Sequence, residues 1–466
     1  MLAGTFPGDI RHAHDTEPVP STGPLRMSAN MDAASVPAHR LRRQDVKTLV
    51  LSALGGALEF YDFVIFVFLA GAIGQLFFPP ETAEWLRTLQ TFGLFAAGYL
   101  ARPLGGIVMA HFGDRHGRKR MFTLSVFLMA LPTLVIGLLP TYAAIGYAAP
   151  LLLLLMRVLQ GAAVGGEVPG AWVFVSEHVP ARRVGLACGV LTAGLTAGIL
   201  LGSLIADAVH SIFDADAVLR WAWRIPFLIG GVFGFLAVIL RRYLAETPVF
   251  RAMRERRELE QGMPLGVVLR RHRLAVIQSM LLTWMLTAAI VVVILMLPAL
   301  MPKLFDIDTM TALRANTAAT LALTIGCVLT GLSTDRFGLR VTLGVGATGL
   351  AATTYLLFAG LAANTPHVAA LYALTGLFVG MVATVPVALV RSFPPAVRFS
   401  GISFAYNVAY ALFGGLTPLV ISLWLRSERM APAHYVTALC VLGLAFAIFG
   451  LPDKKSDNAR ISAPEG

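Results

Sequence analysis

Residues 114–120 read Asp-Arg-His-Gly-Arg-Lys-Arg, and a shorter version of the pattern, Asp-Arg-Phe-Gly-Leu-Arg, occupies residues 335–340. The two copies lie 221 residues apart, and each is a short basic loop between two apolar stretches. A second pair, Pro-Ala-Arg at residues 180–182 and Pro-Ala-Val-Arg at residues 395–398, has nearly the same separation. The repeat predicts that the second half of the chain has the fold of the first.

Long apolar stretches fill most of the chain. Of its 466 residues, 57% are hydrophobic and 14% are charged, whereas a soluble domain carries about 25% charged residues. These values exclude a soluble globule, a coiled coil, a collagen and a disordered chain. A membrane-spanning helix needs about 20 mainly apolar residues. Twelve such spans are predicted, at residues 48–72, 88–111, 121–140, 150–177, 184–207, 223–242, 274–298, 315–333, 341–361, 367–391, 400–424 and 433–451.

A polar stretch separates the first six spans from the last six. The predicted parts are a disordered tail at residues 1–46, an N-terminal bundle at 47–242, a linker loop at 243–272, a C-terminal bundle at 273–452 and a tail at 453–466. The predicted fold class is an all-α integral membrane protein, with twelve transmembrane helices in two pseudo-symmetric six-helix bundles. Parallel halves of this kind leave a cleft between them, where a solute site near the middle of the membrane is expected.

The basic residues are distributed unequally between the two sides of the predicted membrane. Of the 37 Lys and Arg residues, 28 fall in segments on the side of the N-terminus and seven on the other side. The positive-inside rule therefore predicts that both termini are cytoplasmic. The net charge of +11 is explained by this topology, so we expect a lipid bilayer and no nucleic acid as a partner.

Sites for metals and for catalysis are not expected. The three cysteines, Cys188, Cys327 and Cys440, lie in separate apolar runs, and no CxxC spacing is present, which excludes a disulfide framework and a zinc site. The sequence contains no phosphate-binding loop and no pairing of a nucleophile with a base. We therefore expect neither an enzyme nor a cofactor.

The basic loop at residues 114–120 resembles the G-x-x-x-D-R-x-G-R-K signature of the major facilitator superfamily. Ala110 replaces the first glycine, whereas Gly331 retains it in the second copy, in which Leu339 replaces the usual basic residue. Seven further motifs resemble the metabolite:proton symporter family: Glu-Phe-Tyr-Asp-Phe at 59–63, Arg-Pro-Leu-Gly-Gly at 102–106, Arg-Val-Leu-Gln-Gly at 157–161, Gly-Gly-Glu at 165–167, Trp-Arg-Ile-Pro-Phe at 223–227, Glu-Thr-Pro at 246–248 and Phe-Gly-Gly-Leu-Thr-Pro at 413–418.

This resemblance implies a function and a location. Members of the symporter family carry citrate, dicarboxylates, shikimate, or proline and betaines, and they lie in the bacterial inner membrane. The chain departs from the family pattern at Gly56, where relatives have Asn, and at Val168 and Pro169, where relatives have an aromatic residue and Gly. These positions are expected near the pathway, so the substrate of one relative does not transfer to this chain.

Four ionisable residues within the spans are the candidates for proton coupling. Glu59 and Asp62 lie three residues apart in the first span and therefore share a helix face. Two carboxyl groups this close in a low-dielectric medium do not both ionise readily, which suits proton exchange. The family resemblance brings Arg157 and Glu167 of the fourth span toward this pair. The alternatives are a fixed counter-ion or a helix cap for the carboxyl groups, and a permanent ion pair for Arg157.

Polar side chains in the spans expected to line the cavity are the candidates for substrate binding. In the first half they are Tyr61, Gln160 and Arg102, and in the second half they are Gln278, Trp284, Tyr406 and Asn407. The alternative is that most of them hydrogen-bond between helices, and Arg102 has a structural alternative because it lies beside Pro103. The fifth span also carries Gly194, Gly198 and Gly202 at four-residue spacing, which predicts a face for close helix packing.

The two repeated loops are predicted to act as a gate. By resemblance, Asp114 and Arg118 make contacts that close the inner side of the pathway and break when it opens. The full set is Asp114, Arg115, Gly117, Arg118, Lys119, Asp335, Arg336, Gly338 and Arg340. Simple positive-inside anchoring is the alternative for Lys119.

The sequence thus predicts a monomeric proton-coupled symporter that takes up a small polar metabolite by alternating access. An organic acid is the first choice of substrate because Arg157 and Arg102 are buried cations. The alternatives are an efflux antiporter, or uptake of a zwitterion such as a betaine or an amino acid. A membrane sensor that does not transport is a remote alternative, since a sensor is expected to carry an appended signalling domain.

Overall fold

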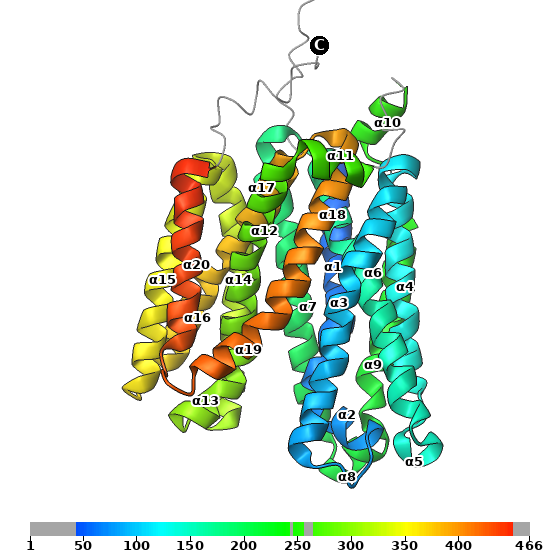
Figure 1. Cartoon of the computed structure of the whole chain (residues 1–466), viewed down its shortest axis with the longest axis vertical. Helices are drawn as coiled ribbons and strands as arrows, with labels where there is room; N and C mark the ends of the chain where they lie inside the picture. Colours follow the sequence, from blue (N-terminus) through cyan, green and yellow to red (C-terminus); the bar gives the residue numbers. More distant parts are fainter. Residues whose placement is uncertain (1–42, 243–245, 256–263, 451–466) are drawn as a thin grey trace, which may run out of the picture. The chain divides into compact units, whose positions relative to one another are not determined.

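The computed structural model describes residues 43–242, 246–255 and 264–450, and Figure 1 shows that they are helical almost throughout. The predictions for the tails at 1–42 and 451–466, and for linker residues 243–245 and 256–263, fall outside the described residues. The two loops at 114–120 and 335–340 lie at one end of the helices, which we call the motif end. The opposite end, which we call the far end, carries the short helices at the bottom of Figure 1.

The first six predicted spans coincide with helices. They are α1 (Arg43–Phe68), α3 (Glu84–His116), α4 (Arg118–Leu138), α6 (Ala148–His178), α7 (Val184–Ile212) and α9 (Arg224–Arg242). Short segments connect them: α2 (Ala70–Phe77), α5 (Tyr142–Ile145), η1 (Ala181–Arg183), α8 (Ala215–Ala217) and η2 (Val218–Ala222).

The last six spans also coincide with helices, but four of them change helix type along their length. They are α12, η3 and α13 (Arg273–Ala288, Ala289–Met296, Leu297–Phe305), α14 (Thr309–Phe337), α15 (Leu339–Ala362), α16, η4 and α17 (Val368–Val379, Gly380–Ala383, Thr384–Ser392), α18, η6 and α19 (Arg398–Ala409, Tyr410–Gly414, Gly415–Trp424), and α20 with η7 (Ala431–Ala445, Phe446–Gly450). The segments η3, η6 and η7 are π-helical, and η4 is a 3-10 helix.

Within the described residues, nine helices are long and apolar enough to cross a membrane, and a bent pair, Ala215–Ala222 with Arg224–Leu240, makes a tenth span. The other two predicted spans are α3, which carries Arg102 and Asp114, and the α18–η6–α19 helix. The fold is therefore the predicted one of twelve transmembrane helices in two six-helix bundles.

The packing of the helices follows the sequence repeat. In the first half α1 packs on α7, α3 on α6, and α4 on α9; in the second half α12 packs on α18, α14 on α16, and α15 on α20. These are the same three pairs, because each helix of the second half corresponds to the helix six spans earlier. Between the bundles, α7 packs on α14 and α3 packs on α18, which are also equivalent pairs.

Glycines allow several of these helices to touch backbone to backbone. A Cβ atom on Gly161 of α6 would lie 1.9 Å from the Gly98 carbonyl oxygen of α3. In the predicted small-residue face of α7, Cβ atoms on Gly194 and Gly198 would each lie 2.3 Å from a carbonyl oxygen of α1, which confirms that prediction. The close contact of α3 with α6 brings the spans that carry Arg102 and Arg157 together.

The described parts of the linker contain two short helices that the sequence did not predict. They are α10 (Pro248–Glu255), in which Phe250 is buried, and α11 (Pro264–Arg271). Both lie at the motif end, at the top of Figure 1. The linker therefore contributes side chains to the same region as the two repeated loops.

Candidate functional site

Two aspartates hold the bundles together at the motif end. Asp114, at the end of α3, accepts hydrogen bonds at its Oδ2 atom from the backbone N–H and the hydroxyl of Ser400 in α18, at 2.9 and 2.8 Å. Asp335, at the end of α14, accepts them from the backbone N–H groups of Gly185 and Leu186 in α7, at 2.8 and 2.9 Å. Each repeated loop thus binds the first turn of a helix in the other bundle.

A partly buried ion pair also joins the two bundles at this end. Glu177 of α6 lies 3.2 Å from the guanidinium of Arg398 in α18, and the two side chains are 1% and 16% exposed. The other Glu177 oxygen accepts a hydrogen bond from the Thr247 hydroxyl at 2.8 Å, so the linker joins the contact. The sequence did not predict a role for Glu177, although Arg398 lies in the repeated Pro-Ala-x-Arg motif.

The other loop residues lie around these contacts. Gly117 and Gly338 have positive φ angles of 115° and 93°, which favour glycine at both turns. The backbone N–H of Lys119 donates to Glu246 at 3.2 Å, and the Arg336 guanidinium lies over the Phe337 ring. The remaining predicted gate residues are Arg115 and Arg340, which are partly buried, and Arg118, whose side chain lies outside the described residues.

Asp62 is fully buried in the N-terminal bundle. Its carboxyl oxygens face α9, where Cβ atoms on Gly230 and Gly234 would lie 2.4 and 3.2 Å from them. Neither oxygen has a hydrogen-bond partner among the described residues. The neighbouring Tyr61 hydroxyl donates to the Pro226 carbonyl at 2.8 Å and thus links α1 to α9. The Glu59 side chain lies outside the described residues, so its pairing with Asp62 stays a prediction.

Arg157 is the first of three buried polar residues on α6 and α4 that are linked by hydrogen bonds. Its Nη1 atom donates to Gln160 at 2.8 Å, and Gln160 donates to the Thr133 hydroxyl at 2.7 Å. The guanidinium also lies over the rings of Phe63 and Phe66, at 4.9 and 4.4 Å from their centres. The Thr133 methyl group and the Asp62 carboxyl group both border Gly230, so the polar chain ends beside Asp62.

Arg102 lies in a group of aromatic rings between the two bundles. Its guanidinium carbon is 5.6, 5.4 and 4.3 Å from the ring centres of Tyr99, Tyr406 and Tyr410. Tyr99 and Tyr410 stack in parallel at 5.5 Å. We call these three tyrosines the tyrosine cage. The sequence predicted Arg102 and Tyr406 but missed Tyr99 and Tyr410, although Tyr99 precedes Arg102 by one helical turn and Tyr410 follows Tyr406 by one.

Asn407 of α18 links the two bundles beside the tyrosine cage. Its side-chain oxygen accepts a bond from Nε of Arg102 at 3.4 Å, and its amide donates to the Gly165 carbonyl of α6 at 2.6 Å. Glu167, two residues further along α6, is 1% exposed and lies within electrostatic range of Asp62 and Tyr406. Two of the predicted site residues, Arg102 and Glu167, therefore lie in the same region of the structure.

Two predicted candidates lie apart from this centre. Gln278 donates to the Gly450 carbonyl at the motif end of the C-terminal bundle, at 3.2 Å. Trp284 donates to the Tyr435 hydroxyl at 2.7 Å and stacks on Phe413. Both contacts join helices of the same bundle.

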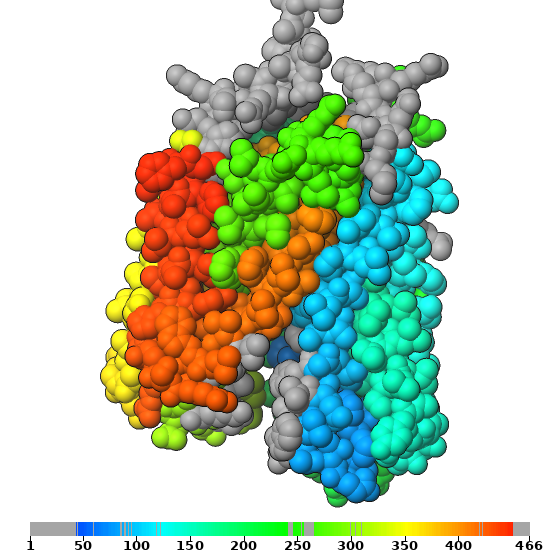
Figure 2. All heavy atoms as spheres, viewed as in Figure 1, coloured from blue at the N-terminus to red at the C-terminus, as the bar shows by residue number. Residues whose placement is uncertain are grey.

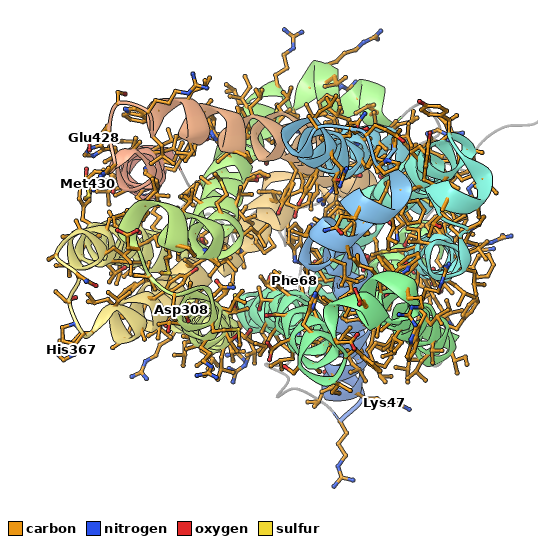
Figure 3. The ribbon with its side chains drawn as sticks, turned by 90° about the horizontal axis from the view of Figure 1, so that it is seen from below. Lys47, Phe68, Asp308, His367, Glu428 and Met430 are labelled. Atoms are coloured by element: carbon orange, nitrogen blue, oxygen red, sulfur yellow. The ribbon has the colours of Figure 1, made fainter. Side chains whose placement is uncertain are left out.

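The bundles diverge on the visible face toward the far end. Figure 2 shows a hollow between the lower part of α3 and the α18–α19 segment. Figure 3, viewed from the far end, places Phe68 of α1 near the middle of the helices, while Glu428, Met430 and His367 lie at the edge of the C-terminal bundle. The closed motif end and this hollow lie on opposite sides of Arg102, which precedes Asp114 on α3 by about 18 Å at 1.5 Å per residue.

Solved structures share this fold at low sequence identity. The chain is similar to the proton:xylose symporter XylE bound to 6-bromo-6-deoxy-D-glucose, with a TM-score of 0.74, 17% identity, and coverage of 88% of this chain and 96% of that chain. It is also similar to the human organic anion transporter MFSD10, with a TM-score of 0.68, 13% identity, and coverage of 87% and 100%.

Curated relatives share more of the sequence. The chain is 32% identical over 441 residues to the proline/betaine transporter of Salmonella typhimurium strain LT2, covering 88% of this chain and 84% of the relative. It is 31% identical over 423 residues to the glycine betaine/proline/ectoine/pipecolic acid transporter OusA of Dickeya dadantii strain 3937, covering 86% and 82%. The profile of the Major Facilitator Superfamily matches residues 52–418. With this match and these relatives, the chain belongs to the major facilitator superfamily of membrane transporters.

Proposed function

We propose that this transporter takes up a small zwitterion of the betaine or proline type together with protons. The observation that carries the proposal is the position of Arg102 against three tyrosine rings at the bundle interface. Aromatic faces attract cations, and cages of such faces recognise quaternary ammonium groups. The names of the relatives at 31% and 32% identity point to the same substrate class.

A zwitterion accounts for the buried charges better than the organic acid that the sequence first suggested. A free carboxylate would pair with Arg102 but would leave the tyrosine faces without a cation. A zwitterion carries both charges, one for the rings and one for the guanidinium. Its net charge of zero also spares the site the cost of taking an uncompensated ion out of water.

Asp62 is the best-placed group to carry the coupled proton. A carboxylate ion buried without a hydrogen-bond donor is costly, whereas the protonated acid is much less so. The absence of a partner for Asp62 among the described residues therefore suits a carboxyl group that holds a proton in this conformation. The Arg157–Gln160–Thr133 chain, which ends beside it, can stabilise the ionised form once the helices rearrange.

Alternating access would use the contacts at the motif end as the gate. The bonds of Asp114 and Asp335 to the opposite bundles, with the Glu177–Arg398 pair, hold that end closed. The basic loops at this end support a cytoplasmic position for it by the positive-inside rule, and we assign the protein to the inner membrane of a bacterium as part of this proposal. The chain would then bind substrate and proton from the outside and release both inside when the gate opens.

Reconstituted vesicles test the proposal. Purified protein in liposomes is expected to accumulate radiolabelled glycine betaine or proline against a gradient when the outside is acidic. A protonophore should reduce the internal concentration to the external one. Accumulation of citrate or succinate without any uptake of glycine betaine or proline would contradict the zwitterion assignment. Export of substrate that is driven by inward proton flow would instead favour the efflux antiporter.

A further inference from the structure

We propose that the Arg102 guanidinium occupies the binding place of the substrate's quaternary ammonium group and leaves it when substrate arrives. The proposal rests on the proposed uptake of a zwitterion and names the part of the molecule that recognises each charge. The tyrosine cage would receive the ammonium group, and the displaced guanidinium would pair with the substrate carboxylate.

The cage has the geometry that a bound cation requires. The ring centres of Tyr99, Tyr406 and Tyr410 all lie within 5.6 Å of the Arg102 guanidinium carbon, inside the distance at which cation–π attraction acts. All three side chains are at most 6% exposed, so bulk water competes weakly for the cation. Trp172 of α6 packs edge-on against Tyr406 at 4.9 Å and keeps that ring in place.

Within the part of the chain that the structure describes, Arg102 keeps one buried hydrogen-bond donor unsatisfied inside the cage. Its Nε atom donates a long hydrogen bond, 3.4 Å, to Asn407, and its side chain also hydrogen-bonds with Tyr406. Its Nη2 atom is buried and has no hydrogen-bond partner among the described residues. A buried guanidinium with an unsatisfied donor gains from a carboxylate, which accepts two parallel hydrogen bonds from it. The site is therefore prepared for an anion next to the cation that replaces Arg102.

The exchange would also bring the substrate into contact with both bundles. Tyr99 and Arg102 belong to α3, whereas Tyr406 and Tyr410 belong to the α18–η6 helix of the other bundle. Movement of the guanidinium would break its bond to Asn407, which is one of the links across the centre. A substrate that lacked either charge would leave the cage or the arginine unpaired, so only a zwitterion completes the exchange.

The test uses a pair of ligands of the same shape that differ in charge. Glycine betaine and its carbon isostere 3,3-dimethylbutanoate share a trimethyl head and a carboxylate, but only the first has a cationic head. Calorimetric titration of the purified wild-type protein is expected to give a Kd at least about thirtyfold lower for glycine betaine. Equal affinity for the two ligands would overturn the proposal without any mutation.

Variants of one cage residue provide the second arm. Tyr410→Phe keeps the aromatic face and should retain the wild-type Kd for glycine betaine within about threefold. Tyr410→Leu removes the face and should raise that Kd at least about tenfold, while Tyr355→Leu, a tyrosine outside the cage, should leave it unchanged. Betaine binding that is insensitive to Tyr410→Leu would overturn the cage while the proposed function stands. A wild-type protein that binds no zwitterion would overturn both.

Discussion

The Asp114 carboxylate accepts hydrogen bonds from both the backbone N–H and the hydroxyl of Ser400, and so fixes the end of α3 to the first turn of α18. Asp335 repeats the arrangement on the first turn of α7. Carboxylates are favoured at helix N-termini, where unpaired N–H groups and the helix dipole attract negative charge. Both contacts cross between the bundles, so opening of the motif end has to break them.

The first prediction is that Asp335→Asn opens the motif end more often. A hydrogen bond to a charged group contributes about 1.5–3 kcal/mol, and the amide cannot accept both backbone N–H groups. A loss of 1.4 kcal/mol changes an equilibrium about tenfold. Cys188, fully buried in α7 between Gly185 and Gly189, which pack on α14, should therefore react with a maleimide about tenfold faster, as measured by mass spectrometry.

Cys440 is the internal control for this measurement. It is 2% exposed and lies in α20, which packs on α15 within the C-terminal bundle. Its labelling rate should not change, because that packing is not part of the gate. Equal acceleration of Cys188 and Cys440 would indicate general loosening of the protein rather than gate opening.

The second prediction concerns the Glu177–Arg398 pair. The pair is partly buried, and removing one partner leaves the other charge without its counter-ion at a site with little access to water, which is costly. Glu177→Arg and Arg398→Glu are each expected to reduce the initial rate of glycine betaine uptake more than tenfold. The double exchange should recover part of the rate, but not all of it, since Arg at position 177 cannot accept the Thr247 hydroxyl bond. A double variant no faster than the slower single variant would argue against the pair.

The third prediction is that Asp62→Asn separates proton coupling from substrate exchange. Uptake by the wild type should rise as the outside pH falls, because the carboxyl group loads its proton from that side. The amide cannot release a proton, so the variant should still exchange labelled for unlabelled substrate but should no longer concentrate it or respond to pH. Asp207→Asn, an exposed carboxylate on α7, is the matched control. If Asp62→Asn still accumulates substrate, the combination with Glu59→Gln decides whether Glu59 carries the proton.

The number and order of the helices could be predicted from the sequence because most spans are long apolar stretches, and the repeat supported the two more polar ones, α3 and the α18–η6–α19 helix. The repeated loops also predicted the equivalence of the two halves, which the matching packing of α3 on α6 and of α14 on α16 bears out. The π-helical stretch in η6 and the two linker helices could not be predicted in this way. The π-helical stretch escapes prediction because an apolar run looks the same whether its turns are α or π. The linker helices escape it because the linker is polar and lacks the long apolar run that indicates a span.

The site was only partly predictable, for a physical reason. Asp62, Arg102, Arg157 and Glu167 were found because a charge in an apolar span is rare and costly. Tyr99 and Tyr410, which surround Arg102, are neutral and amphipathic, so they do not stand out among apolar neighbours. Contacts such as Asp114 with Ser400 join residues 286 positions apart, and no local pattern encodes them.

The fourth prediction is that Gly161→Ala destabilises the N-terminal bundle. The new Cβ atom would lie 1.9 Å from the Gly98 carbonyl oxygen, and a backbone atom cannot move aside as a flexible side chain can. Overpacking typically costs about 1–3 kcal/mol, and here α3 and α6 would have to separate. The melting temperature of the purified protein should fall by several degrees, with a lower yield of monodisperse material. Gly415→Ala, an exposed position in α19 with nothing within 4 Å, is the matched control and should melt at or slightly above the wild-type temperature, since Ala favours the helix. Equal melting of the two variants would mean that α3 and α6 are less closely packed than the structure has them.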